Sequence, residues 1–151
     1  MAAPGGQQGQ PIPITSLSLE QLSNLKQQFE EEAQTLAASL QKLKTAGQRF
    51  LDSKDSLAAL TPETNGREVL APLTSSLYVK GKLTNVEAVM IDIGTGYYIE
   101  RTPQQAQEYV DRKLGLVQEN AEKLQQALLT KRKNLEAIIG VMQEKMAQQP
   151  Q

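Results

Sequence analysis

Residues 76–101 read SLYVKGKLTNVEAVMIDIGTGYYIER, a β-rich stretch that separates two long helical segments. Its apolar residues alternate with polar ones, and a period of two is typical of half-buried strands. Gly94-Thr95-Gly96 favours a hairpin turn, and Thr84-Asn85 marks a break. Another short strand is expected at 68–73, with Pro72 at its end or on an edge. The sequence therefore predicts four short strands over residues 67–101, arranged as two β-hairpins.

An apolar ladder with seven-residue spacing precedes this insert. Its members are Leu22, Phe29, Leu36, Leu43, Phe50 and Leu57. Such a repeat keeps one seam facing a partner helix and implies a left-handed supercoil. Ser18 and Gln21 have the spacing of a capping box, and Thr61-Pro62 cannot continue a helix. We therefore predict a helix over residues 18–60.

A second ladder with 4/3 spacing follows the insert. Its members are Val110, Leu114, Val117, Ala121, Leu124, Leu128, Leu135, Ile138 and Met142. Thr102, Pro103 and Gln105 form a helix start with a capping box and a proline at the first helical position. We predict a helix over residues 103–147. Lys131 and Lys145 also occupy seam positions, where a lysine stem lies along the seam while the amine stays in water.

The two predicted helices have nearly equal lengths, which an antiparallel hairpin explains. The predicted fold is mainly α with small β: a long antiparallel two-helix coiled coil with two β-hairpins at the helix junction. We expect a single domain over residues 15–147. The Gly/Gln/Pro-rich residues 1–14 are predicted to be a disordered tail, and residues 148–151 a short second tail.

Composition and charge exclude several classes of protein. Of 151 residues, 39% are apolar and 4% aromatic, which is too little for a thick globular core but enough for a two-helix seam. The net charge of −1 offers no bulk attraction to nucleic acid or anionic membrane, so neither is expected as a partner. There is no cysteine, no long apolar run and no secretory signal pattern. We expect a cytoplasmic protein, and a nuclear location stays open.

Residues suited to catalysis are missing from the sequence. It has no histidine and no cysteine, which removes the commonest general base, metal ligand and thiolate nucleophile. Gly94-Thr95-Gly96 lacks the phosphate-loop pattern. The basic run Lys131-Arg132-Lys133 fits a solvated helix face better than a nucleic-acid site. We predict no enzyme, no catalytic residue, no cofactor and no metal site.

With both ladders and the insert in view, the chain resembles an α-class prefoldin subunit. The resemblance lies in VLAPL at 69–73, SLYVKGKL at 76–83 and VMIDIGTGYY at 89–98. It covers about residues 15–147. The insert is the specific part, because heptads alone match many coiled coils. The β class of this family carries one hairpin, whereas this insert has room for two.

This resemblance implies an assembly and a function. The assembly is a heterohexamer of two α-class and four β-class prefoldin subunits, in which the hairpins join into a double β-barrel. The function is that of an ATP-independent co-chaperone, which captures unfolded actin and tubulin and delivers them to the cytosolic group II chaperonin. The client is held at the coil tips, which the two ends of each chain form.

Apolar residues crowd the two chain ends that would form such a tip. A two-stranded seam buries only its a and d positions, so some of these residues are left over, and methionine adapts to varied partners. The alternative is that the surplus broadens the seam and reduces fraying. The predicted client-binding residues are Leu17, Leu19, Leu22, Leu25, Ile138, Ile139, Val141, Met142 and Met146.

The apolar residues of the insert need a partner surface as well as each other. Isolated hairpins are at best marginally stable in water, and open sheet edges invite pairing. The predicted subunit-assembly residues are Val69, Leu77, Val79, Leu83, Val86, Val89, Ile91, Ile93 and Ile99.

One alternative function stays open from the sequence. The ladders suit a coiled-coil adaptor, or a transcription-regulating scaffold, that binds one folded partner. Breadth of binding separates the two hypotheses, because a chaperone binds many unfolded clients and ignores their native forms.

Overall fold

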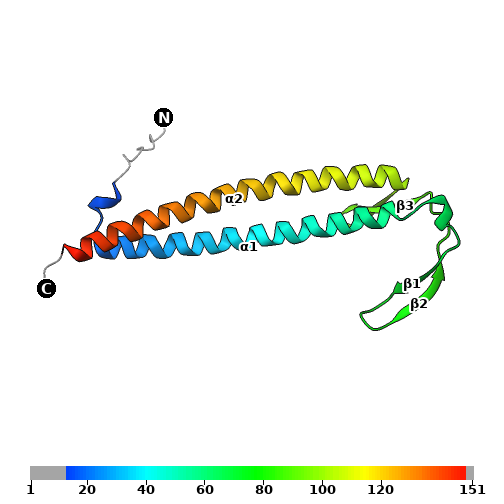
Figure 1. Cartoon of the computed structure of the whole chain (residues 1–151), viewed down its shortest axis with the longest axis horizontal. Helices are drawn as coiled ribbons and strands as arrows, with labels where there is room; N and C mark the ends of the chain where they lie inside the picture. The colour runs from blue at the N-terminus through cyan, green and yellow to red at the C-terminus, as the bar shows by residue number, and fades with distance from the viewer. Residues whose placement is uncertain (1–12, 149–151) are drawn as a thin grey trace, which may run out of the picture. The chain divides into compact units, whose positions relative to one another are not determined.

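The computed structural model describes residues 13–148 and contains two long helices and two β-hairpins (Figure 1). Helix α1 spans Leu19–Ala58, and helix α2 spans Pro103–Ala147. The strands between them are β1 (Glu68–Pro72), β2 (Tyr78–Lys82), β3 (Val89–Gly94) and β4 (Tyr97–Arg101). Short 3-10 turns at Ile14–Ser16 and Pro62–Thr64 complete the order. The predicted fold class is confirmed.

The chain divides into two compact units, and each long helix contributes to both. One unit, here the terminal unit, contains α1 up to Leu40 and α2 from Glu122 onward. The other, the hairpin unit, contains residues 41–121 with all four strands. In each unit the α1 and α2 segments lie side by side (Figure 1), as the two ladders predict. Of the predicted tails, residues 1–12 and 149–151 lie outside the described residues.

Both helices begin at a capping box read from the sequence. The backbone N–H of Ser18 donates to Gln21 Oε1 at 2.9 Å, and the N–H of Gln21 donates to Ser18 Oγ at 3.2 Å. Thr102 and Gln105 make the same reciprocal pair at 3.2 and 3.3 Å. Each box satisfies two N–H groups that the first helical turn leaves without a partner.

Helix α1 ends at Ala58, two residues before the predicted end at Leu60. The last turn tightens, since the Leu60 N–H donates to the Leu57 carbonyl three residues back, at 3.1 Å. Thr61 is extended, with φ −119° and ψ 161°, because the following Pro62 disfavours helical backbone at the residue before it. The helix therefore ends about one turn before the proline.

Each hairpin forms its own two-stranded antiparallel sheet. Strands β3 and β4 are joined by Thr95 and Gly96, with φ of 52° and 82°. Positive φ at both loop residues is the requirement of a type I′ hairpin turn. The register shifts between Asp92 and Gly94, and the Asp92 carboxylate accepts a hydrogen bond from the Gly94 N–H at 2.8 Å. The predicted turn at 94–96 is therefore part of a bulged hairpin.

Both units have small, apolar cores, and none of residues 13–148 is a buried polar or charged residue. In the terminal unit the buried side chains are Leu22, Leu40, Leu128 and Ile138. In the hairpin unit they are Val86, Ala106 and Val110. The other ladder residues are half-buried, because a seam of two helices leaves its sides open to water. The core is thin and follows the predicted ladders in part, since Leu40, Val86 and Ala106 are not members of them.

Candidate binding surfaces

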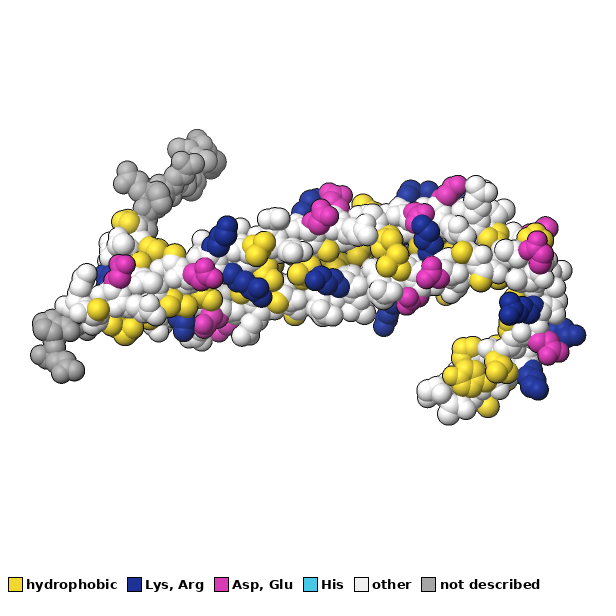
Figure 2. Space-filling view, viewed as in Figure 1, with side chains coloured by type: hydrophobic (Ala, Val, Ile, Leu, Met, Phe, Trp, Pro, Cys, Tyr) yellow, Lys and Arg dark blue, Asp and Glu magenta, His cyan; other side chains and the backbone are white. Residues whose placement is uncertain are grey.

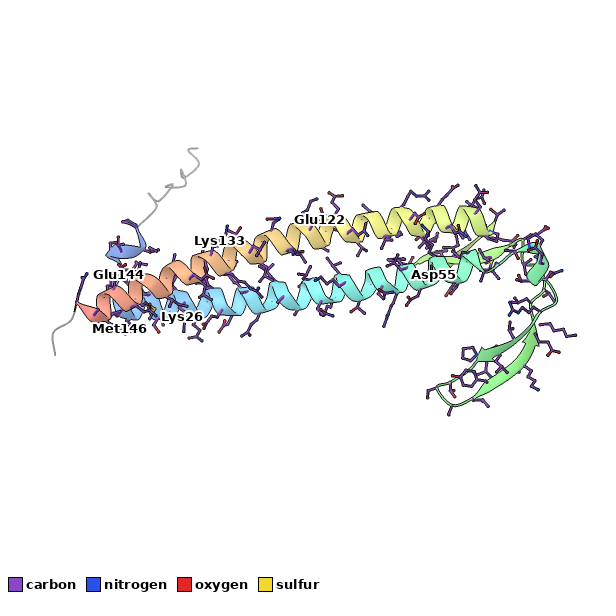
Figure 3. All side chains as sticks on the ribbon, in the orientation of Figure 1. Lys26, Asp55, Glu122, Lys133, Glu144 and Met146 are labelled. Carbon is purple, nitrogen blue, oxygen red and sulfur yellow. The ribbon has the colours of Figure 1, made fainter. Side chains whose placement is uncertain are left out.

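The seam of the terminal unit contains one charged cluster. Lys131 of α2 lies over the ring of Phe29 of α1, with its Nζ 4.2 Å from the ring centroid, and it forms an ion pair with Glu32. Gln28 donates a hydrogen bond to Glu32 at 3.1 Å. Lys131 therefore contacts α1 and is not part of the solvated basic run expected from the sequence. Lys133 of that run is exposed and points away from α1 (Figure 3).

This cluster changes the acidity of one group. The Lys131 side chain, and after it the Gln28 amide, hydrogen-bonds the Glu32 carboxylate, and both hold the pKa of Glu32 below its ordinary value. A hydrogen bond to the ionised form favours that form. Glu32 is therefore a carboxylate over the physiological pH range.

The seam of the hairpin unit has a point of close approach. Gly47 of α1 is buried, and a Cβ at this position would lie 3.5 Å from Val117 Cγ1 and 3.8 Å from Leu114 Cδ1 of α2. One heptad further along α1, Lys54 Nζ lies 2.6 Å from Asp111 Oδ1 of α2. Gly47 and Lys54 therefore both lie against α2 in this unit.

The predicted client-binding residues differ in their exposure. Met146 is 55% exposed, near the C-terminal end of α2 (Figure 3). Leu22 and Ile138 are only 0% and 2% exposed, so they belong to the seam and are unavailable to a client. The half-buried members are Leu17, Leu19, Leu25, Ile139, Val141 and Met142. We therefore remove Leu22 and Ile138 from the predicted client-binding surface, because both side chains are buried in the seam between α1 and α2.

Hairpin β1–β2 has one apolar face, which we call the β1–β2 apolar face. The register pairs Ala71 with Val79, and the Leu73 N–H continues the ladder by donating to the Leu77 carbonyl at 2.9 Å. Alternation along the strands then places one set of side chains on this face. The set is Val69, Ala71, Leu73, Leu77, Val79 and Gly81. Leu77 and Val79 are 53% and 47% exposed, and Figure 2 shows apolar side chains gathered on this hairpin.

The opposite face of β1–β2 is mixed. It carries Glu68, Leu70, Pro72, Tyr78, Lys80 and Lys82. Charged residues suit a face in contact with water, whereas the β1–β2 apolar face has no polar side chain. Since β1 and β2 pair only with each other among the described strands, each also has an open edge.

Hairpin β3–β4 is partly covered by the helices of its own unit. Val89 and Ile91 line a groove of about 510 Å³ with Phe50, Leu57 and other residues of α1 and α2. Ile99, which pairs with Ile91, is half-buried, and so are Val69 and Leu83 of the other predicted assembly residues. Ile93 is 46% exposed. This hairpin thus uses part of its apolar surface within the chain.

Val86 has a different position from the one predicted. It is 7% exposed and lines a small pocket with Leu60, Pro62 and Pro103 of the same unit. It therefore packs inside the chain, and we correct its assignment from subunit assembly to the core. The sequence contained no local signal for this burial, because it depends on how the 83–88 loop folds against the helix ends.

Two kinds of site are absent from the described residues: a metal-ligand cluster and a membrane-crossing helix. Residues 13–148 contain no group of three or more acidic, histidine or cysteine side chains placed to hold a metal ion. Neither α1 nor α2, within the described range, contains a stretch apolar enough to cross a bilayer. The candidate binding surfaces are the β1–β2 apolar face and the apolar residues at the helix ends.

Comparison with known proteins gives a consistent answer. The chain matches the prefoldin subunit family over residues 29–148. It is 43% identical over 140 residues to the probable prefoldin subunit 5 of Dictyostelium discoideum, covering 93% of this chain and 87% of that protein. It is 42% identical over 139 residues to prefoldin subunit 5 of Homo sapiens, covering 92% of this chain and 90% of that protein.

A solved structure shares the fold. A chain of the filamentous PFD from Methanocaldococcus jannaschii has a TM-score of 0.67 to this structure at 20% identity, and the match covers 76% of this chain and 95% of that chain. At this identity the likeness concerns the fold alone. The family match and the relatives confirm the resemblance seen in the sequence: the chain belongs to the prefoldin family and resembles prefoldin subunit 5.

Proposed function

We infer that this chain is an α-class subunit of a hexameric, ATP-independent co-chaperone that captures unfolded proteins. In this proposal its clients include actin and tubulin, which the complex delivers to the cytosolic group II chaperonin. The observation that carries the proposal is a prefoldin-family chain whose β1–β2 apolar face is uncovered. The proposal places the chain in the cytoplasm and gives it no catalytic role.

Other prefoldin subunits are the proposed occupants of the β1–β2 apolar face. Burial of apolar surface contributes about 25 cal/mol per Å² to the free energy of association. A face of leucine and valine therefore favours a stable interface with another subunit. The open edges of β1 and β2 would extend this cover by strand pairing. In a six-subunit barrel of two α-class and four β-class chains, the apolar side chains would be buried and the backbone groups of the open edges would be hydrogen-bonded.

The clients are proposed to contact apolar residues at the ends of the helices. After removal of the two buried seam residues, the surface consists of Leu17, Leu19, Leu25, Ile139, Val141, Met142 and Met146. Half-buried side chains give an unfolded chain apolar contact without a shaped pocket, and this suits clients of varied sequence.

The proposal is tested by purifying the chain with a C-terminal tag from its own cells and identifying the bound proteins by mass spectrometry. We expect five further small coiled-coil hairpin proteins in fixed ratio, with chaperonin, actin or tubulin below stoichiometry. A single folded partner in equal amount would favour the adaptor function instead. The tag expressed alone is the control for non-specific binding.

A further inference from the structure

The apolar ladders alone do not define how α1 is aligned against α2. A ladder with a strict seven-residue repeat presents a similar seam after a shift of one heptad along its axis. In α1 the ladder residues before and after Phe29 are Leu22 and Leu36, so large apolar residues recur at each step. Another feature has to select one alignment.

Lysines at seam positions provide such a feature. In α1, Lys26 and Lys54 each follow a ladder residue by four positions and so lie in the second row of the seam. A single lysine at a core position of a coiled coil selects alignment at some cost in stability, because its amine needs a partner or water. Lys131 of α2 and Lys54 of α1 each reach an acid on the other helix, Glu32 and Asp111 respectively. The two ion pairs lie in different units, about three heptads apart along each helix.

The partners of Lys131 are present at one position only. Its ammonium lies over Phe29 and pairs with Glu32, one turn further along α1. After a shift of one heptad toward the start of α1, Leu22 and Leu25 would occupy these two places. After the opposite shift, Leu36 and Ser39 would occupy them. Neither alternative gives Lys131 a carboxylate.

The same comparison holds for Lys54. Its partner in the structure is Asp111. One heptad before and after Asp111 in α2 are Gln104 and Gln118, and neither is acidic. A shift of one heptad in either direction thus removes the acid from both lysines at once.

We propose that Lys54 and Lys131 fix the alignment of α1 against α2, acting as an alignment lock at the edge of the apolar seam, where their side chains are 41% and 31% exposed. Of the alignments that keep the apolar ladders in contact and differ by one heptad, the observed one alone pairs both lysines with acids. The lock specifies which residues of the two helices lie opposite each other, and the leucines and valines of the ladders hold them together.

The test uses the fact that the sequence has no cysteine, so introduced cysteines report without background. Since a Cβ at Gly47 would lie 3.5 Å from Val117 Cγ1, the pair G47C/V117C reports the observed alignment. The pairs G47C/V110C and G47C/L124C report shifts of one heptad. Each pair is introduced into the full chain and oxidised, and the crosslinked fraction is measured by gel mobility and mass spectrometry.

The lock is removed with K54M/K131M, which keeps long apolar side chains in the seam. The matched control is K26M/K145M, which replaces two other seam lysines. Lys26 pairs with Glu30 of its own helix at 3.4 Å, and the described residues give Lys145 no ion pair. We expect the lock variant to raise the shifted crosslinks about tenfold relative to the observed one, and the control variant to leave the ratio unchanged.

Retention of a single alignment by K54M/K131M would overturn the proposal, as would an equal change in the control. If K54M/K131M does not fold, the charge-exchanged variant K54D/D111K/E32K/K131E answers the same question. It restores both ion pairs with reversed direction and should keep the observed crosslink. Shifted crosslinks in this variant would also contradict the lock.

Discussion

At the scale of single residues, Leu22 shows how the chain uses its few buried side chains. It is fully buried and lies four residues after the N-cap Ser18, where the helix start and the seam coincide. Leu17, just before the cap, is half-buried at the position from which a hydrophobic staple reaches such a residue. Loss of this side chain therefore affects both the seam and the start of α1.

We expect Leu22→Ala to lower the free energy of unfolding by about 2–5 kcal/mol, the usual range for a buried leucine. Chemical denaturation followed by circular dichroism at 222 nm measures the change. Leu51→Ala, at a site that is 40% exposed on the same helix, should change it by only about 0.5 kcal/mol. Similar losses in both variants would show that Leu22 is not a specific anchor.

Glu32 gives the chain a pH dependence with a definite sign. Its pKa is lowered in the folded chain, mainly by the Lys131 hydrogen bond. The folded state therefore favours the ionised form, and this stabilisation is complete above the unfolded pKa of about 4.3. It is lost as the pH falls through the lower folded value. Glu63, whose pKa is lowered mainly by a hydrogen bond with Thr61, acts in the same direction.

We expect the thermal midpoint to be nearly constant from about pH 7 to pH 5 and to fall below about pH 4.3. The thermal midpoint of the Glu32→Gln variant should fall less over the acidic range, because glutamine takes up no proton at this position. Glu31→Gln, which changes a neighbouring exposed acid, serves as the control. Identical acid profiles for Glu32→Gln and the unmodified chain would remove Glu32 from the explanation.

At the scale of secondary-structure elements, the two hairpins differ in how their apolar surface is used. The β1–β2 apolar face is uncovered in the chain, while Val89 and Ile91 of β3 line a groove against α1 and α2. Substitutions on the β1–β2 apolar face should therefore leave the helices intact and affect contacts with other chains alone.

We expect Leu77→Ser with Val79→Ser to weaken assembly of the proposed hexamer by about tenfold or more per residue, since each loses about 2 kcal/mol of apolar burial. Size-exclusion chromatography with light scattering measures the assembled fraction, and circular dichroism at 222 nm should not change. Leu70→Ser with Tyr78→Ser alters two residues of the opposite face that are exposed to a similar or slightly greater degree, and it is the matched control. Full assembly of the first variant would contradict the assigned role.

Most elements were predictable because their signals are local. The capping boxes at Ser18 and Thr102, the proline after α1 and the glycines of the β3–β4 turn each act within a few residues. The ladders likewise predicted that Leu128 and other seam residues are buried. Such features depend on backbone geometry and on the side-chain period, which a single sequence displays.

The features that sequence analysis missed depend on tertiary contacts. Val86 was predicted to bind other subunits, but the fold of its loop buries it. The sequence predicts Lys131 to belong to a solvated basic run, although its seam position also allows a contact across the helices. Its partners Phe29 and Glu32 became identifiable only when the alignment of α1 against α2 was known. An aromatic residue and an acid three positions apart on α1 were the available signal, and it has little specificity alone.

At the scale of the whole molecule, more large apolar side chains of the described residues are exposed than are buried. Seven apolar side chains are buried among the described residues, while large apolar residues are exposed on the strands and near the end of α2. A prefoldin-family chain with this distribution depends on other molecules to cover its apolar surface. Client capture by the proposed tip residues is therefore separable from subunit assembly.

We expect Leu19→Ser, Leu25→Ser, Ile139→Ser and Val141→Ser together to reduce suppression of aggregation of an unfolded client severalfold while the complex still assembles. Light scattering of diluted, denatured actin measures the suppression. Leu51→Ser, Leu116→Ser and Leu129→Ser replace exposed leucines elsewhere on the helices and control for loss of apolar surface as such. Unchanged suppression by the tip variant would show that clients bind elsewhere.

The uncovered β1–β2 apolar face has a consequence for the cell's supply of this chain. A copy synthesised in excess of its partners exposes Leu73, Leu77 and Val79 together with two unpaired strand edges, which are features of an aggregation-prone surface. We therefore expect a copy without partners to be degraded and not stored. The abundance of the chain would then follow the synthesis of its partners, and raising its messenger RNA alone would increase turnover instead of the amount of complex.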